Sequence, residues 1–131
     1  MERLELKYRD ALKALSTLKD ILREPFSVIV RDAAIQRFEY TFEAFWKFIR
    51  EYLKKEEGII ANSPISCFKE IFSLGFSSED ETVGLQEMTD KRNGTSHTYK
   101  EGVAQGIYEK LAEYYALMEK MLLLFKDRLT G

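Results

Sequence analysis

The sequence of 131 residues contains one histidine, one cysteine and two prolines, and these shortages exclude several kinds of site. Cys67 has no second cysteine with which to form an internal disulfide. One cysteine and one histidine are too few ligands for a zinc site within the chain. Di-iron helical bundles need Glu-x-x-His pairs, and the sequence has none. We therefore expect neither a metal centre nor a cofactor.

The sequence also lacks an apolar run of about 18 residues, the length that a membrane-spanning helix needs. It starts with a charged amphipathic segment and not with a signal peptide. These features predict a cytoplasmic protein without a membrane partner. The formal charge of −2 argues against general coating of nucleic acid, because non-specific binding depends on many neutralised phosphates, but it leaves room for one local basic cleft.

Helical periodicity, in contrast, is abundant. With 45% hydrophobic residues, the chain has enough apolar material for one domain over residues 1–131. Apolar residues three and four apart predict long helices at about residues 2–23, 27–57, 79–92 and 99–129. No segment shows the alternation of a strand. The sequence therefore predicts an all-α protein, an up-and-down four-helix bundle with an additional short helix.

Capping residues mark where these helices begin. Ser27 is the expected N-cap of the second helix, and Ser63-Pro64 starts the short helix, which should end at Gly75. Two capping boxes, Ser78 with Glu81 and Thr98 with Glu101, are expected to start the last two long helices. The short helix is expected to bury three residues, Ile65, Phe68 and Phe72.

The helix at 27–57 has a main seam of apolar residues, Ile35, Phe38, Phe42, Phe45, Ile49 and Tyr52. Its apolar surface is wider than this one stripe, since Tyr40, Trp46 and Phe48 lie beside the seam. Such a helix is either central to the bundle or also packs against a second copy of the protein. Most of its basic residues are expected on a solvated face. These residues are Arg31, Arg37, Lys47, Arg50, Lys54 and Lys55.

The strongest candidate site surrounds His97, which is the only side chain whose unperturbed pKa allows proton transfer in both directions near neutral pH. Arg92, five residues earlier, follows Leu85 and Met88 on the buried seam of its helix. A charged group in such a position should pair with a carboxylate, line a wet cleft or bind an anion.

Several polar residues adjoin this pair. If Thr98 is an N-cap, Tyr99 is the first helical residue, and free backbone N–H groups beside the imidazole favour a phosphate or another anion. The positive end of the helix also favours neutral imidazole. Four neighbours are expected to bind the substrate or an anion: Lys91, Asn93, Ser96 and Lys100.

The spacing of Arg92, His97 and Tyr99 on a helical bundle resembles the HEPN superfamily. It is similar in particular to the branch of nucleotidyltransferase substrate-binding proteins, also described as HepT-like ribonuclease toxins. The stretch 31–43 and the Ser63-Pro64 helix start are similar to the same branch.

This resemblance implies a homodimeric toxin that cleaves RNA without a metal, with Arg92 and His97 as catalytic residues. It also implies a cognate minimal nucleotidyltransferase as antitoxin, which silences the toxin by adenylylating Tyr99. The alternative is a non-catalytic subunit that binds a nucleotide or substrate for a two-component nucleotidyltransferase.

The chemistry of RNA cleavage fits a dimer. Attack by the 2′-hydroxyl needs a base, an acid for the leaving 5′-oxygen and positive charge on the transition state. One chain has one histidine, and on an ideal helix Arg92 and His97 lie about 140° apart. Two copies of the chain supply two imidazoles and two guanidinium groups.

Overall fold

The computed structural model describes residues 2–130 and contains six α-helices and one 3₁₀ turn in that range, with no strand. The helices are α1 (Arg3–Leu22), α2 (Val28–Glu57), α3 (Pro64–Ser73), α4 (Glu79–Asn93), α5 (Glu101–Tyr108) and α6 (Leu111–Thr130). The 3₁₀ turn, η1 (Thr95–His97), lies between α4 and α5. The predicted all-α class is confirmed.

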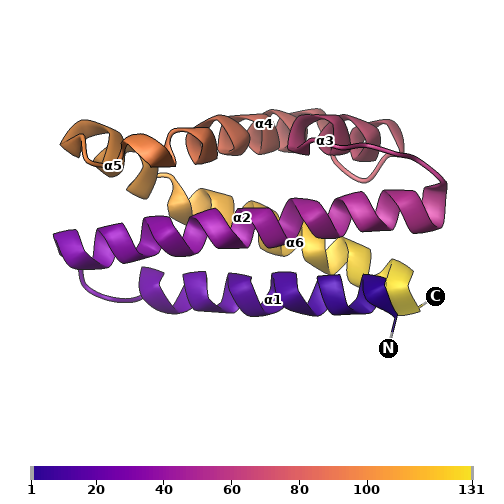
Figure 1. The fold of residues 1–131 in the computed structure, drawn as a ribbon, viewed down its shortest axis with the longest axis horizontal. Helices are drawn as coiled ribbons and strands as arrows, with labels where there is room; N and C mark the ends of the chain where they lie inside the picture. Colours follow the sequence, from indigo (N-terminus) through magenta and orange to yellow (C-terminus); the bar gives the residue numbers. More distant parts are fainter. Residues whose placement is uncertain (1, 131) are drawn as a thin grey trace.

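Four long helices alternate in direction and form the bundle (Figure 1). α1 and α2 lie antiparallel, α4 lies on the other side of α2, and α6 crosses behind α2 towards the end where both termini lie. The short α3 packs beside α4, and α5 continues from the end of α4 at the opposite end of the bundle. The predicted up-and-down bundle is therefore present, with two short helices in place of one.

α2 is the central helix. Its predicted seam is buried, and so are Trp46 and Phe48 beside that seam, whereas Tyr40 is 42% exposed. Aromatic rings of α2 pack edge to face against rings of other helices. Examples are the contacts of Phe42 with Phe68 on α3 and of Phe48 with Phe125 on α6. The wide apolar surface of α2 is thus covered almost entirely by its own chain, and it does not by itself require a second copy.

The predicted starts of the first four helices agree with the structure within a residue. Ser27 caps α2 by accepting a hydrogen bond from the N–H of Val30, and Gly58 ends α2 with a left-handed φ of 67°. Ser63 and Ser78 both form capping boxes. These ends are fixed by residues adjacent in sequence, and for that reason the sequence predicts them.

Three local predictions are wrong. Phe72 is 43% exposed, because the buried stripe of α3 is centred on Cys67, Phe68 and Ile71 and leaves Ile65 and Phe72 at its edges. The helix expected over 99–129 starts at Glu101 and breaks into α5 and α6. At the break, Lys110 donates to the carbonyl of Ile107, three residues back, so the α-helical bonding pattern is interrupted there.

The third wrong prediction is the cap at Thr98. Its φ of −72° and ψ of −7° are helical, whereas an N-cap needs an extended backbone. Lys100 has that extended backbone and precedes α5 without a side-chain capping bond. Tyr99 therefore lies in the turn before the helix and is not its first residue.

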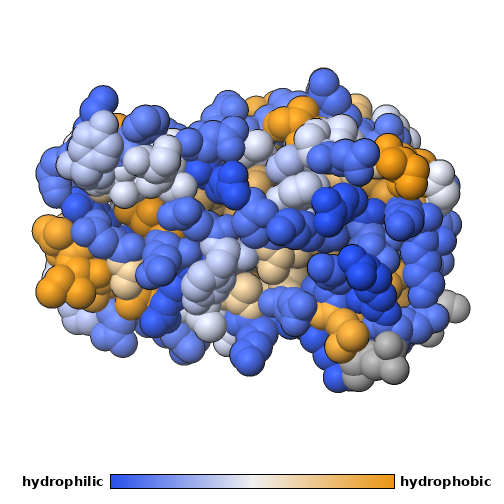
Figure 2. Space-filling view, viewed as in Figure 1, coloured by the Kyte–Doolittle hydropathy of each residue, from blue (hydrophilic) through white to orange (hydrophobic). Residues whose placement is uncertain are grey.

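The surface differs between the two ends of the bundle. Figure 2 shows hydrophilic residues over the middle of α2 and hydrophobic residues at the end where α2 begins. The exposed apolar side chains at that end are Phe26, Val28 and Ile29. Among the helices of the described residues, none combines the length and apolar character that a membrane crossing needs.

Candidate functional site

The candidate site lies where α4 ends and η1 carries the chain towards α5. Thr95 is buried and donates its hydroxyl to the carbonyl of Arg92 at 2.8 Å. His97 donates its backbone N–H to Gly94 at 3.1 Å, and Lys100 donates to His97 at 3.0 Å. These bonds set the turn on the end of α4 and place His97 five residues after Arg92 along the chain.

Arg92 pairs with a carboxylate, as one of the three predicted arrangements requires. Its Nη2 contacts Glu43 on α2, and Glu43 is also 3.4 Å from the Lys47 ammonium. The Nε of Arg92 is buried and has no acceptor among the described residues. Arg92 also lines an open cavity of about 370 Å³, which corresponds to the predicted cleft. The other residues that line it are Gln36, Glu39, Tyr40 and Glu43.

His97 and Tyr99 lie together and point outward. Their ring centroids are 6.3 Å apart in an edge-on arrangement, and the Lys100 ammonium is 5.9 Å from the Tyr99 ring. Tyr99 is 78% exposed, and His97 is exposed as well. No hydrogen bond of the Tyr99 hydroxyl or of the imidazole nitrogens occurs within residues 2–130.

The structure does not join Arg92 to His97. No hydrogen bond connects them in the described part of the chain, and Arg92 is directed towards α2 instead. Of the other candidate residues, Asn93, Ser96 and Lys100 are exposed, and Lys91 is half-buried. One chain thus presents the candidate residues on neighbouring surfaces without assembling them into a closed pocket.

Arg31 is the residue that the sequence analysis missed. It was expected on a solvated face, yet it is only 5% exposed. Its Nη1 lies 2.8 Å from Glu101 and its Nε 3.1 Å from Asp32. The hydrogen bond with Glu101, followed by that with Asp32, raises the Arg31 pKa against the opposing effect of burial. Arg31 therefore fastens the start of α5 to α2.

The sequence carried a signal for this residue. Arg31 precedes Ile35 by four residues and so continues the buried seam of α2. The same spacing identified Arg92 on α4. Each arginine takes a seam position of its helix, where an apolar residue would be expected, near the candidate site. Each also pairs with a carboxylate from another helix.

Cys67 is not a candidate nucleophile. It is buried, and this burial raises the pKa of its thiol to about 11, so the thiol stays protonated near neutral pH. The described residues contain no group of three or more His, Cys, Asp or Glu side chains arranged to hold a metal ion. His97 is the one histidine in the sequence.

These features define a small antiparallel helical bundle that exposes a histidine and a tyrosine on a turn beside a paired arginine. The family model described as "nucleotidyltransferase substrate binding protein like" matches residues 6–127. The chain belongs to this family, which confirms the resemblance at the level of the family.

A solved structure agrees with this assignment. The chain is similar to a protein of Thermus thermophilus whose crystal structure has 44% sequence identity and a TM-score of 0.82. The match covers 86% of this chain and 95% of that one. No curated protein matches the sequence.

Proposed function

We propose that this chain is a HepT-like toxin, a metal-independent endoribonuclease whose Arg92 and His97 form a site in a homodimer and whose partner is a minimal nucleotidyltransferase acting as antitoxin. The exposed imidazole of His97 carries this proposal. The imidazole lies on a turn that is hydrogen-bonded to the end of α4. Its nitrogens make no hydrogen bond with any group of residues 2–130. An imidazole in that position is free to take a proton from a substrate.

The reaction follows from the residues present. One His97 takes the proton of the 2′-hydroxyl, and the 2′-oxygen attacks the adjacent phosphorus. The bond from phosphorus to the 5′-oxygen breaks, and the second copy's imidazolium gives that oxygen a proton. Arg92 stabilises the charge on the phosphorane-like transition state. The products are a 2′,3′-cyclic phosphate and a 5′-hydroxyl, so no metal or redox step is needed.

The absence of a hydrogen bond between Arg92 and His97 among the described residues is the reason for placing the site between two copies. One chain offers a single imidazole, and its Arg92 is engaged with Glu43. A second copy adds the imidazolium that acts as the acid. The phosphate of the RNA then replaces Glu43 as the partner of Arg92. The remaining residues of the turn, Ser96 and Lys100, contact the strand from their exposed positions.

An RNA cleavage assay with EDTA tests the proposal. We expect the wild type to cleave single-stranded RNA and His97→Ala to lose a factor of about 10² to 10⁴ in rate. Arg92→Ala should lose activity as well, whereas Arg23→Ala, at an exposed arginine after α1, should not. The melting temperature of His97→Ala should match the wild type, because the side chain is exposed.

Sedimentation velocity provides the second measurement. The wild type should be a dimer at tens of micromolar, a concentration at which a standard-sized interface persists. A strictly monomeric protein that still cleaves RNA would reject the shared site. A folded His97→Ala protein with wild-type activity would reject the role of the imidazole.

One observation favours a second function, that of a non-catalytic subunit binding a nucleotide or substrate for the nucleotidyltransferase. Within one chain Arg92 lines an open cavity of about 370 Å³ that His97 does not line, so a ligand can bind there without proton transfer by His97. If this function is correct, calorimetry should detect binding of a nucleotide that Arg92→Ala weakens, while the wild type leaves RNA intact in the assay above.

A further inference from the structure

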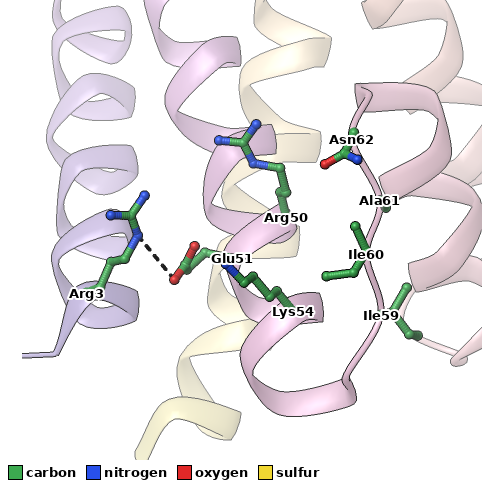
Figure 3. Close-up of a pocket in the computed structure, with 8 residues that line it drawn as sticks. All are labelled: Arg3, Arg50, Glu51, Lys54, Ile59, Ile60, Ala61 and Asn62. Atoms are coloured by element: carbon green, nitrogen blue, oxygen red, sulfur yellow. Dashed lines mark ion pairs between the residues drawn. The ribbon is translucent and has the colours of Figure 1, made fainter.

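A second pocket lies further along α2 than the Arg92 cavity, and it begins about two helical turns beyond Glu43. It is formed where α1 begins, where α2 ends and where the segment after Gly58 runs back along α2, and its volume is about 230 Å³. Figure 3 shows Ile60 and Asn62 of that segment directed towards the α2 side, with Arg50, Glu51 and Lys54 on α2 and Arg3 on α1. Nothing in the proposed cleavage step uses this pocket.

The pocket carries an excess of positive charge. Three cationic residues line it, Arg3, Arg50 and Lys54, against one carboxylate, Glu51. Glu51 is 3.2 Å from the Nε of Arg3 and is thereby compensated. Among the described residues, neither Arg50 nor Lys54 has a carboxylate within ion-pair distance. In a chain whose formal charge is −2, this local excess suits an anionic ligand.

Arg50 is also held in place for binding. Its guanidinium lies 5.0 Å from the centre of the Trp46 ring, in a cation–π contact, and Trp46 is itself buried in the core. No hydrogen bond to the guanidinium occurs in the described residues. A half-buried arginine that is fixed by stacking and keeps its donors free matches the planar oxygens of a phosphate.

The size and lining of the pocket indicate a phosphate group of a larger molecule. Pockets that enclose a whole drug-sized ligand measure about 300 to 1,000 Å³, more than this one. Asn62 adds an amide to the cationic side chains, and Ile60, which is 67% exposed, adds an apolar surface at the rim. The pocket therefore fits a phosphate with an adjoining sugar or base outside it.

The helical geometry of α2 relates this pocket to the Arg92 cavity. Glu43 and Arg50 are seven residues apart, so they share one face of α2 and are separated by about 10 Å along the helix axis. Lys47, on the same face, lies between them. Figure 2 shows that the surface over this part of α2 is hydrophilic. A single strand laid along α2 would thus pass both places.

We infer that the pocket lined by Arg50, Lys54 and Asn62 binds a backbone phosphate of the single-stranded RNA whose cleaved phosphate lies at Arg92 and His97. The identity of the strand rests on the proposed function. The pocket positions the strand along α2 and takes no part in the bond-breaking step, and the second contact lowers KM without changing kcat.

Fluorescence anisotropy with a labelled, fully 2′-O-methylated oligoribonucleotide tests this inference, because such a strand has no 2′-hydroxyl to attack. Arg50→Gln and Lys54→Gln are measured between 50 and 200 mM salt beside two controls of matched charge, Arg23→Gln and Lys69→Gln. Both control residues are exposed and lie outside the pocket. Thermal melts of all four variants establish that they are folded.

Each pocket substitution should weaken binding by about fivefold to tenfold. It should also lower the slope of log K against log salt by about 0.7, the value for one lost contact with a single strand. With cleavable RNA, Lys54→Gln should raise KM and leave kcat unchanged. The two controls should bind like the wild type.

The outcomes separate the two proposals. One outcome is that Lys54→Gln and Lys69→Gln bind with equal affinity and equal salt slope while the wild type binds and cleaves RNA. That result would overturn the role of the pocket and leave the proposed nuclease function standing. Binding that depends on the pocket without any cleavage would support the pocket and reject the nuclease. A 5′-mononucleotide that binds as tightly as the oligomer, with the same loss on substitution, would overturn the assignment to a strand. A wild type that neither binds nor cleaves would overturn both.

Discussion

The starts of α4 and α5 contain the same local signature, a hydroxyl residue followed three positions later by glutamate, and they are built differently. At α4, Ser78 accepts from the N–H of Glu81 at 3.1 Å, and the Glu81 carboxylate accepts from the N–H of Ser78 at 2.8 Å. At α5, neither bond forms between Thr98 and Glu101, and the Glu101 carboxylate pairs with Arg31 on α2.

This difference separates a helix that fixes its own start from one that is fixed by a neighbour. The box at α4 satisfies backbone donors with residues adjacent in sequence. The start of α5 depends on an ion pair between residues 70 positions apart, and the turn before it, with His97 and Tyr99, is left uncapped and exposed. Backbone hydrogen bonds hold the turn proposed to function, while the His97 and Tyr99 side chains make no hydrogen bond in the described residues.

The largest expected effect concerns the exposed hydroxyl in that uncapped turn. After co-expression with the cognate nucleotidyltransferase, intact-mass spectrometry of the wild type should show an added nucleotide monophosphate, and Tyr99→Phe should show none. Tyr99 is 78% exposed and its hydroxyl makes no bond in the described residues, so a partner enzyme can reach it. The added phosphate would compete with RNA for Arg92.

Tyr115→Phe is the matched control for this experiment. Its hydroxyl donates to Glu119 at 2.8 Å, and burial followed by that hydrogen bond raises its pKa to about 12. Modification should persist in Tyr115→Phe. Modification found on residues other than Tyr99 would leave steric blocking by the antitoxin as the better account.

The next effect concerns the ion pair that fixes α5. Arg31→Ala should speed amide hydrogen exchange in α5 and leave exchange in α4 unchanged, because the carboxylate of Glu101 is otherwise exposed and has no other cationic partner in the described residues. The melting temperature should fall further than in any capping variant. Arg23→Ala should change neither, and equal exchange in α5 of wild type and Arg31→Ala would show that packing alone holds this helix.

A smaller effect distinguishes the two hydroxyl residues. Ser78→Ala should reduce the free energy of unfolding by about 1 kcal/mol, the usual cost of a lost N-cap. Thr98→Ala should change it by less than about 0.5 kcal/mol, because Thr98 has no capping bond to lose. Urea unfolding followed by circular dichroism measures both values. Equal losses would mean that Thr98 caps α5 in solution.

The smallest effect is on the pH dependence of stability. The Lys120 ammonium, followed by the N–H of Ser78, lowers the Glu81 pKa below its usual 4.5. Since the folded pKa is depressed, this stabilisation is present above the unfolded pKa and is lost as the pH falls through the folded value. Glu81→Gln should therefore flatten the fall in urea midpoint between about pH 5 and pH 3. Glu79→Gln, an exposed control beside it, should keep the wild-type curve.

The sequence predicted those parts of the fold that depend on neighbours along the chain. Spacings of three and four predicted the seams of the long helices, and the apolar residues on them are buried except Leu22 at the end of α1, which is partly buried. Ser27, Ser63 and Ser78 gave three helix starts correctly. The sequence also placed Arg92 on the seam of α4, and the structure pairs it there with Glu43 while the Arg92 side chain stays 35% exposed.

Predictions that depend on residues far apart in sequence were less successful. The cap at Thr98 failed because Glu101 finds a stronger partner in Arg31, and Arg31 was expected on a solvated face. Arg50 was also expected there, yet it stacks on Trp46 and lines a pocket with the segment after Gly58. The spacing of residues predicts on which face of a helix a side chain lies. It does not predict which side chains of another helix contact that face.

The sequence by itself determined the helical class, the buried seams, the capped helix starts and the family, because periodicity, capping and motif spacing are properties of nearby residues. Only the tertiary structure decided that Arg92 pairs with Glu43, that Arg31 fastens α5, and that His97 stays apart from Arg92 within one chain. Ion pairs between helices depend on how the helices pack. That packing depends on the fit of all the core side chains together and not on residues adjacent in sequence.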